Sequence, residues 1–155
     1  MPLIETKYFG TKTYDPESVF DFPFGLPGFE EEKRFVFIDL EEYAPLVFLQ
    51  SLNRSSLCFL SLPVLVADPA YSLAISADDL ASLGIDPAQA AQLGPGMLAL
   101  ALVSLYDGSS ATANLMAPIV VNVQKRRALQ AIRMDRSYSH QHPISAQYLR
   151  SERAC

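Results

Sequence analysis

Residues 20–37 read FDFPFGLPGFEEEKRFVF and place a rigid corner between two extended segments. The corner, residues 26–29, reads LPGF, with proline where a turn needs a fixed negative φ and glycine where a type II turn needs a positive φ. Phe20, Phe22 and Phe24 alternate along the segment before the corner, so we expect all three rings to enter one core. Burial of each ring would contribute about 1.5 to 3 kcal/mol, which is enough to fix the corner in place.

The composition of the 155-residue chain predicts a single folded domain, because 50% of the residues are hydrophobic and only 19% are charged. No apolar stretch approaches the roughly 20 residues of a membrane span, and residues 1–10 lack the apolar core of a secretory signal. We therefore predict a cytoplasmic protein without membrane contact. Cys58 and Cys155 have neither a disulfide pattern nor ligand spacing, so no cofactor or metal is expected.

The net charge of −5 is unevenly distributed along the chain. Residues 1–60 contain 10 acids and 5 bases, residues 61–123 contain 5 acids and no base, and residues 124–155 contain 2 acids and 7 bases. The first two ranges therefore sum to −10 and the last to +5. This asymmetry favours a protein partner with a basic surface, while a solvated acidic face that keeps the protein in solution is the alternative.

Most periodic segments alternate with period two or form short apolar runs, as is typical of strands. We expect strands near residues 3–9, 34–39, 46–51, 58–62, 71–75, 97–106, 111–115, 119–123 and 127–133. Many short strands favour a closed sheet, because closure removes exposed strand edges. The sequence therefore predicts a mainly β fold, a small antiparallel β-barrel or barrel-like sandwich.

A helical insertion is predicted near residues 77–93. Ser76 can cap a first helix that ends at Gly84, and Asp86-Pro87 can start a second helix before Gly94. After the strands, residues 137–155 contain few large apolar side chains, so we expect one barrel domain over residues 1–136 and a partly ordered tail, which Tyr138 and Tyr148 could dock locally.

Three consecutive glutamates follow the corner, and a rigid support would display them as an acidic contact site. The alternative is that they only solubilise a strand end. From the charge pattern we expect a partner-binding set made of Glu30, Glu31, Glu32, Glu41 and Glu42.

Several blocks of the sequence closely resemble the bacterial flagellar assembly factor FliW family. They are FPFGLPGFE at residues 22–30, LQS at 49–51, CFLSLP at 58–63, and NLMAPIVVN at 114–122 followed by Gln130. The blocks occur in that order and at similar spacing, and the resemblance covers residues 8–138.

The resemblance implies a small cytoplasmic β-barrel-like protein that is not an enzyme. Members of the family bind flagellin, at its terminal helical region, and also bind CsrA, an RNA-binding dimer that represses flagellin translation. The two partners antagonise each other, so that secretion of flagellin frees the protein to capture CsrA. Such a switch requires only differences in affinity and changing free concentrations.

The family-motif residues are interpreted mainly as structural. Buried amides usually satisfy backbone groups, and Pro118 leaves backbone groups unmatched in its strand. The motif residues are Phe24, Gly25, Leu26, Pro27, Gly28, Phe29, Gln50, Asn114, Pro118, Asn122 and Gln130.

The main rival is a small barrel that binds nucleic acid through its basic cluster, residues 125–136. The cations are Lys125, Arg126, Arg127, Arg133 and Arg136. The cluster lacks neighbouring aromatic residues for base stacking, and the rest of the chain would repel phosphate. We therefore expect no direct nucleic-acid binding.

A metalloenzyme or hydrolase is a weaker rival. His140 and His142, with Asp135 or Cys155, lack the further ligands and the supporting hydrogen bonds that a metal site needs. Neither a nucleophile elbow nor a phosphate-binding glycine loop is present. The sequence predicts a binding protein and no catalytic residue.

Overall fold

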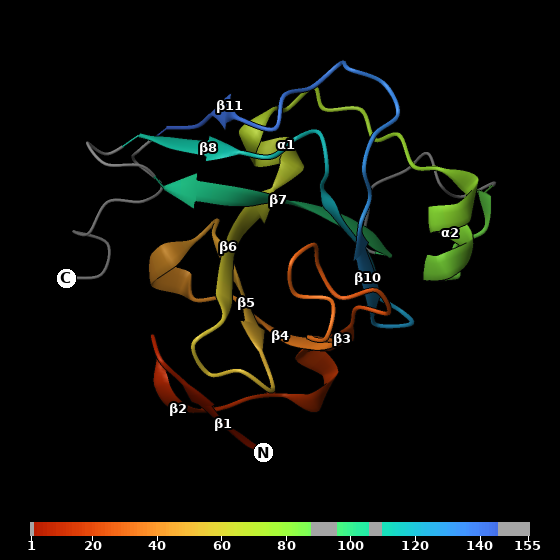
Figure 1. The fold of residues 1–155 in the computed structure, drawn as a ribbon. Helices are drawn as coiled ribbons and strands as arrows, with labels where there is room; N and C mark the ends of the chain where they lie inside the picture. Colours follow the sequence, from red (N-terminus) through yellow and green to blue (C-terminus); the bar gives the residue numbers. More distant parts are fainter. Residues whose placement is uncertain (1, 88–95, 106–109, 146–155) are drawn as a thin grey trace.

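A computed structural model describes residues 2–87, 96–105 and 110–145, and its fold is mainly β. Seven strands close into a mixed barrel in the order β7-β6-β5-β4-β3-β10-β9, with β9 pairing back onto β7 (Figure 1). These strands are β3 (Val19–Asp21), β4 (Arg34–Ile38), β5 (Val47–Ser51), β6 (Cys58–Pro63), β7 (Met97–Leu105), β9 (Ile119–Asn122) and β10 (Arg127–Gln130). The predicted small β-barrel is confirmed.

The long, apolar strand β7 makes closure possible, because it is shared among three neighbours. Its first residues pair with β9, its middle with β6, and its last three residues pair with β8 (Ala111–Ala113). All pairings are antiparallel except that of β10 with β3, in which Arg127 lies opposite Asp21. This one parallel pair makes the barrel mixed rather than purely antiparallel.

Short elements surround the barrel. A separate hairpin joins β1 (Leu3–Thr6) to β2 (Gly10–Thr13), and β11 (His142–Pro143) pairs with β8 beyond the ring. Two 3-10 turns, η1 (Pro16–Ser18) and η2 (Glu41–Tyr43), precede β3 and follow β4. The predicted tail is thus paired with β8 in its described part, and its residues 146–155, with Tyr148, lie outside the described residues.

Two short helices lie in the part of the chain that the structure describes: α1 (Val64–Ala67) and α2 (Ala77–Leu83). In α2 the Ser76 hydroxyl accepts a hydrogen bond from the Asp79 N–H at 3.1 Å, and Gly84 ends the helix at φ 72°. This predicted helix is confirmed, and Leu83 packs it against the outer face of the barrel. The second predicted helix lies outside the described residues.

The predicted strand at residues 71–75 is wrong, because this segment pairs with no strand. Tyr71 is buried and its hydroxyl donates to the Leu115 carbonyl at 2.8 Å, so burial without a sheet produces the apolar alternation. Four short elements, β2, β3, β11 and α1, were not predicted from the sequence.

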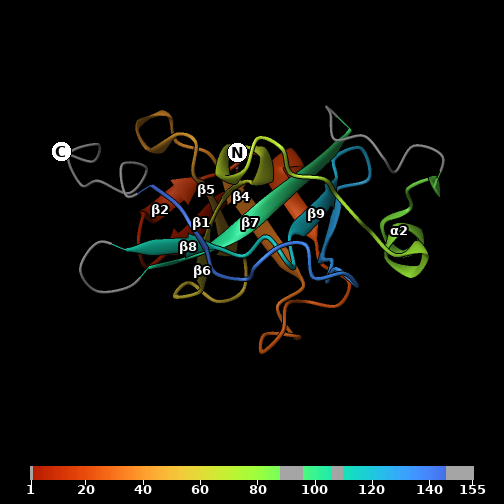
Figure 2. The ribbon, with the colours of Figure 1, turned by 90° about the horizontal axis from the view of Figure 1, so that it is seen from above.

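The barrel interior is an apolar cluster contributed by most of the strands. It contains Phe20, Phe22, Leu26, Phe35, Leu49, Leu100, Ile119, Val121 and Ala128. Leu26 comes from the loop between β3 and β4, which projects from the body of the molecule in Figure 2. Among the described residues, no helix has the length and hydropathy of a membrane span.

Candidate partner-binding site

The β3–β4 loop, residues 22–33, is rigid because its backbone bonds to itself and the Phe22 and Leu26 side chains enter the barrel. Residues Leu26 and Phe29 form an isolated bridge, with the Phe29 N–H donating to the Leu26 carbonyl at 2.7 Å. Gly28 has the positive φ of 85° that the predicted turn requires. Leu26 is only 2% exposed, so the corner is fixed to the core.

Gly25 allows the two arms of the loop to approach each other closely. Its φ is +61°, and a Cβ added there would lie 2.6 Å from the Glu30 Cα. Any larger residue would therefore clash with backbone atoms.

Phe24 does not enter the core, so the expectation that all three rings would be buried together is wrong for this residue. Phe20 and Phe22 are buried as predicted, but the Gly25 N–H donates to the Phe22 carbonyl at 2.9 Å and closes a turn. The turn ends the alternation of the extended segment and leaves Phe24 58% exposed. A large aromatic ring is thus displayed from a rigid support.

Glu30 and Glu31 are both exposed on the outgoing arm of the loop. A carboxylate oxygen of Glu30 accepts the Gly28 N–H at 3.0 Å. This hydrogen bond, and a second from its own N–H, lower the pKa of the Glu30 carboxyl, with a smaller contribution from Lys33. Glu30 is therefore charged at neutral pH and its side chain is held in one direction.

Glu32 is not displayed with its two neighbours, which corrects the expectation of three presented carboxylates. It is 7% exposed and accepts a hydrogen bond from the Ser51 hydroxyl at 2.7 Å. An Arg54 nitrogen lies 3.6 Å from its second carboxylate oxygen. Glu32 joins the loop to the end of β5 and is unavailable to a partner in this arrangement.

Glu41 and Glu42 are exposed in η2, at the opposite end of β4 from the glutamates of the loop. The two pairs lie beyond opposite ends of β4, whose five residues span about 16 Å at about 3.3 Å per residue. The structure therefore divides the predicted partner-binding set into two exposed pairs and one buried carboxylate.

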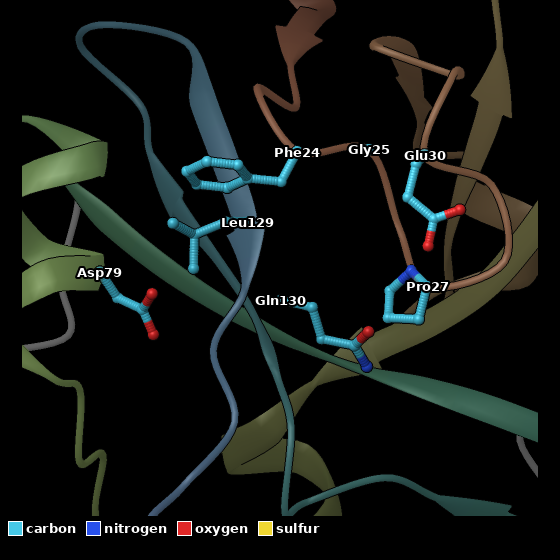
Figure 3. A pocket seen from close by; sticks show the side chains of 7 residues that line it. All are labelled: Phe24, Gly25, Pro27, Glu30, Asp79, Leu129 and Gln130. Atoms are coloured by element: carbon cyan, nitrogen blue, oxygen red, sulfur yellow. The ribbon is translucent and has the colours of Figure 1, made fainter.

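A hollow of about 190 Å³ lies between the loop, β10 and α2 (Figure 3). It is lined by Phe24, Gly25, Pro27, Glu30, Asp79, Leu129 and Gln130. In Figure 3 the Phe24 ring lies beside Leu129, while Asp79 faces the hollow from α2 and Glu30 and Pro27 border the other side. Asp79 and Leu129 could not be assigned to this site from the sequence, because only the folded barrel places α2 and β10 beside the loop.

The amides of the family motif bond to backbone groups. Asn114 accepts the N–H groups of residues 116 and 117, and Asn122 donates to the Leu83 carbonyl at 2.8 Å. Gln130 donates to the carbonyl of residue 117, and Gln50 donates to three carbonyls. In the part of the chain that the structure describes, the Gln50 Oε1 has no hydrogen-bond partner. Pro118 is buried at the start of β9.

The basic cluster is divided by the fold. Arg133 is 5% exposed, because its guanidinium lies 5.3 and 4.6 Å from the ring centroids of Tyr71 and Tyr138, which contact each other at 4.4 Å, and because it binds both oxygens of Asp135. Arg133 is therefore a buried structural cation and not a free phosphate ligand. We call these four residues the Arg133 clamp.

Three cations of the cluster remain at the β9–β10 hairpin. Arg126 and Arg127 each donate to a backbone carbonyl, of residues 16 and 82, and the Lys125 side chain lies against Gly84. The Arg136 side chain is exposed beyond the Arg133 clamp. The five cations do not form the continuous track that a phosphate backbone would need.

The two histidines lie in the last described segment, and Cys155 lies outside the described residues. His140 is exposed and His142 pairs with Ala113 in the sheet. Within residues 2–87, 96–105 and 110–145, no three His, Cys, Asp or Glu side chains are grouped to hold a metal ion. Burial raises the pKa of the Cys58 thiol to about 11, so it is protonated at neutral pH.

The fold and the loop define a class of protein: a small closed β-barrel that displays a rigid aromatic and acidic loop. Residues 3–144 match the family described as FliW protein. The chain belongs to the FliW family of flagellar assembly factors, which are not enzymes. The resemblance found in the sequence is confirmed.

Individual relatives agree over nearly the whole chain. The flagellar assembly factor FliW of Bacillus subtilis (strain 168) is 34% identical over 145 residues, covering 94% of this chain and 98% of the relative. The FliW of Bacillus licheniformis is 36% identical over 145 residues, with the same coverage. A crystal structure of the flagellar assembly factor FliW superimposes with a TM-score of 0.79 at 33% identity, covering 92% of this chain and 96% of the other.

Proposed function

We propose that the protein acts in the cytoplasm by binding flagellin and a CsrA-type translational regulator, and thereby couples flagellin translation to flagellin export. While flagellin is abundant it occupies the protein, and when flagellin is exported the freed protein captures the regulator. The two partners need only compete or be negatively coupled for this switch to operate.

The observation that carries the proposal is the pairing of an exposed aromatic ring with fixed carboxylates on one rigid loop. Phe24 is 58% exposed, and Glu30 is held by the Gly28 N–H at 3.0 Å. Aromatic anchors supply much of the affinity at protein interfaces, and preformed loops avoid the entropy cost of ordering on binding.

Charge supports the choice of a basic regulator as one partner. An acidic surface attracts an RNA-binding protein and steers its approach, and the Glu31 carboxylate of the loop is exposed. The buried Glu32 contributes no such attraction, so Glu30 and Glu31 form the charged part of the proposed contact.

Biolayer interferometry with purified flagellin and CsrA tests the proposal. We expect both proteins to bind, and flagellin to reduce the capture of CsrA. The Glu30→Lys/Glu31→Lys variant should slow association with CsrA by about tenfold at low salt, because rim charges mainly change the association rate. Absence of binding to both proteins by a folded sample would refute the function.

A matched variant separates position from net charge. Glu5→Lys/Glu17→Lys makes the same charge change at exposed acids of β1 and η1. We expect it to alter association much less than the loop variant does. Equal slowing by both variants would remove the loop from the contact site while leaving the function in place.

A further inference from the structure

The hollow beside Phe24 has the size of one apolar side chain. A buried cavity of about 150 Å³ is enough to hold benzene, and this hollow has a volume of about 190 Å³. Phe24, Pro27 and Leu129 provide its apolar walls. A leucine, methionine or phenylalanine side chain from another protein would therefore fill it.

The rim of the hollow is negatively charged on two sides. Glu30 borders it from the loop, and Asp79 faces it from the first turn of α2 (Figure 3). Its lining residues include no cation. The nearest one along the loop, Lys33, bonds through its ammonium to the Pro23 carbonyl at 3.1 Å. The charges around the hollow thus favour a positively charged occupant.

The walls are fixed before any partner arrives. Gly25 and Gly28 hold the loop in its turn, and Leu129 is buried against Leu83 of α2. A preformed pocket of this kind binds without the cost of ordering its own walls.

We propose that this hollow receives one apolar side chain from a basic amphipathic segment of a protein partner, with a neighbouring lysine or arginine placed between Glu30 and Asp79. This inference rests on the proposed function, names the chemistry of the segment that docks, and adds α2 to the contact site. A helix can present such a pair, because residues three or four positions apart lie on one face.

The probe is the short peptide acetyl-Lys-Ala-Ala-Leu-Ala-Ala-Lys-amide, in which each lysine is three positions from the leucine, titrated into isotope-labelled protein and followed by two-dimensional NMR. We expect saturable shifts of the Leu129 methyls and of the Gly25 and Gly28 amides. A peptide with glutamate in place of lysine, and one with serine in place of leucine, should each bind about tenfold more weakly or worse. No saturable shift at these positions would overturn the inference.

Two neighbouring carboxylates provide the matched control. Asp79 lines the hollow, whereas Asp78 is exposed in the same turn and does not line it. Asp79→Asn should weaken both the lysine peptide and the protein partner severalfold, and Asp78→Asn should change neither. Equal effects of the two variants would show a general charge effect and would overturn the inference.

The outcomes separate this inference from the proposed function. If the lysine peptide binds in the hollow but flagellin and CsrA do not bind the protein, the hollow stands and the function fails. If both proteins bind with affinities that Phe24→Ala and Asp79→Asn leave unchanged, the function stands and the inference fails.

Discussion

The β3–β4 loop and the Arg133 clamp are both rigid, but the loop exposes the carboxylates of Glu30 and Glu31 and the clamp buries its cation. The loop is fixed by its own backbone turn, and it leaves Phe24 and Glu30 exposed to solvent. The clamp is fixed by side chains, and it buries Arg133 against two tyrosine rings that contact each other. The charge counted along a sequence therefore does not give the charge of the protein surface, because the fold buries some charged side chains in ion pairs and exposes others.

The largest expected effect comes from breaking the clamp. Arg133→Ala removes the ion pair with Asp135, the stacking on both rings and the hydrogen bond to the Ser72 carbonyl at 2.6 Å. The free energy of unfolding should fall by about 3 kcal/mol. That loss lowers the melting temperature by about 6 to 12 °C, as calorimetry would measure.

The exposed Arg136 is the control for the clamp. Arg136→Ala should change the free energy of unfolding by less than about 0.5 kcal/mol, because surface substitutions away from such networks have small effects. Equal melting temperatures for the two variants would show that the Arg133 clamp does not stabilise the barrel.

The next effect tests the backbone turn of the loop. Gly25→Ala places a Cβ 2.6 Å from the Glu30 Cα at a positive φ, so we expect a loss of about 2 to 3 kcal/mol in urea unfolding. Gly28 also has a positive φ, but a Cβ there meets no atom within 4 Å. Gly28→Ala should cost only about 1 kcal/mol. A smaller loss at Gly25 than at Gly28 would contradict the close approach.

A smaller effect separates the buried glutamate from its exposed neighbour. Glu32→Ala leaves the Ser51 hydroxyl and Arg54 without their partner and should destabilise the protein by about 1 to 2 kcal/mol. Glu31→Ala should leave stability unchanged, because Glu31 is exposed. Chemical denaturation of both variants measures the difference in the free energy of unfolding. Equal values would show that the contacts of Glu32 with Ser51 and Arg54 do not stabilise the fold.

The smallest effect is the pH dependence of the clamp. Hydrogen bonds from Arg133 lower the pKa of the Asp135 carboxyl below its ordinary value of 3.8. The carboxylate therefore stabilises the fold above pH 3.8, and this contribution is lost as the pH falls through the lowered value.

Melting curves between pH 2 and about pH 7 test this contribution against Asp135→Asn. The variant should melt lower than wild type near neutral pH and approach it at the acid end. Parallel curves across the whole range would show that Asp135 makes no ionic contribution to the Arg133 clamp.

Local signals made the barrel, the turn and helix α2 predictable. Pro27 and Gly28 set the turn through their own backbone preferences, and Ser76 and Gly84 mark the ends of α2. Alternating apolar residues predicted most of the strands, because each strand has one face in the core.

The exposed ring, the buried Glu32 and the buried Arg133 could not be predicted from local sequence. Glu32 is buried where it bonds to Ser51 of β5. Arg133 is buried where it contacts Tyr71, which lies far from it in the sequence, and Tyr138. Phe24 shares the alternation of its two buried neighbours until a backbone turn ends it. These outcomes depend on tertiary contacts that a periodic pattern does not contain.

The most direct test of the account is to measure stability and partner affinity on the same variant, Phe24→Ala, with Tyr8→Ala as the exposed aromatic control. We predict an affinity for CsrA or flagellin at least about tenfold weaker for Phe24→Ala, with a free energy of unfolding within about 0.5 kcal/mol of wild type. Tyr8→Ala should change neither quantity. Unchanged affinities for both partners, or a loss of stability typical of a core phenylalanine, would contradict the displayed role of this ring.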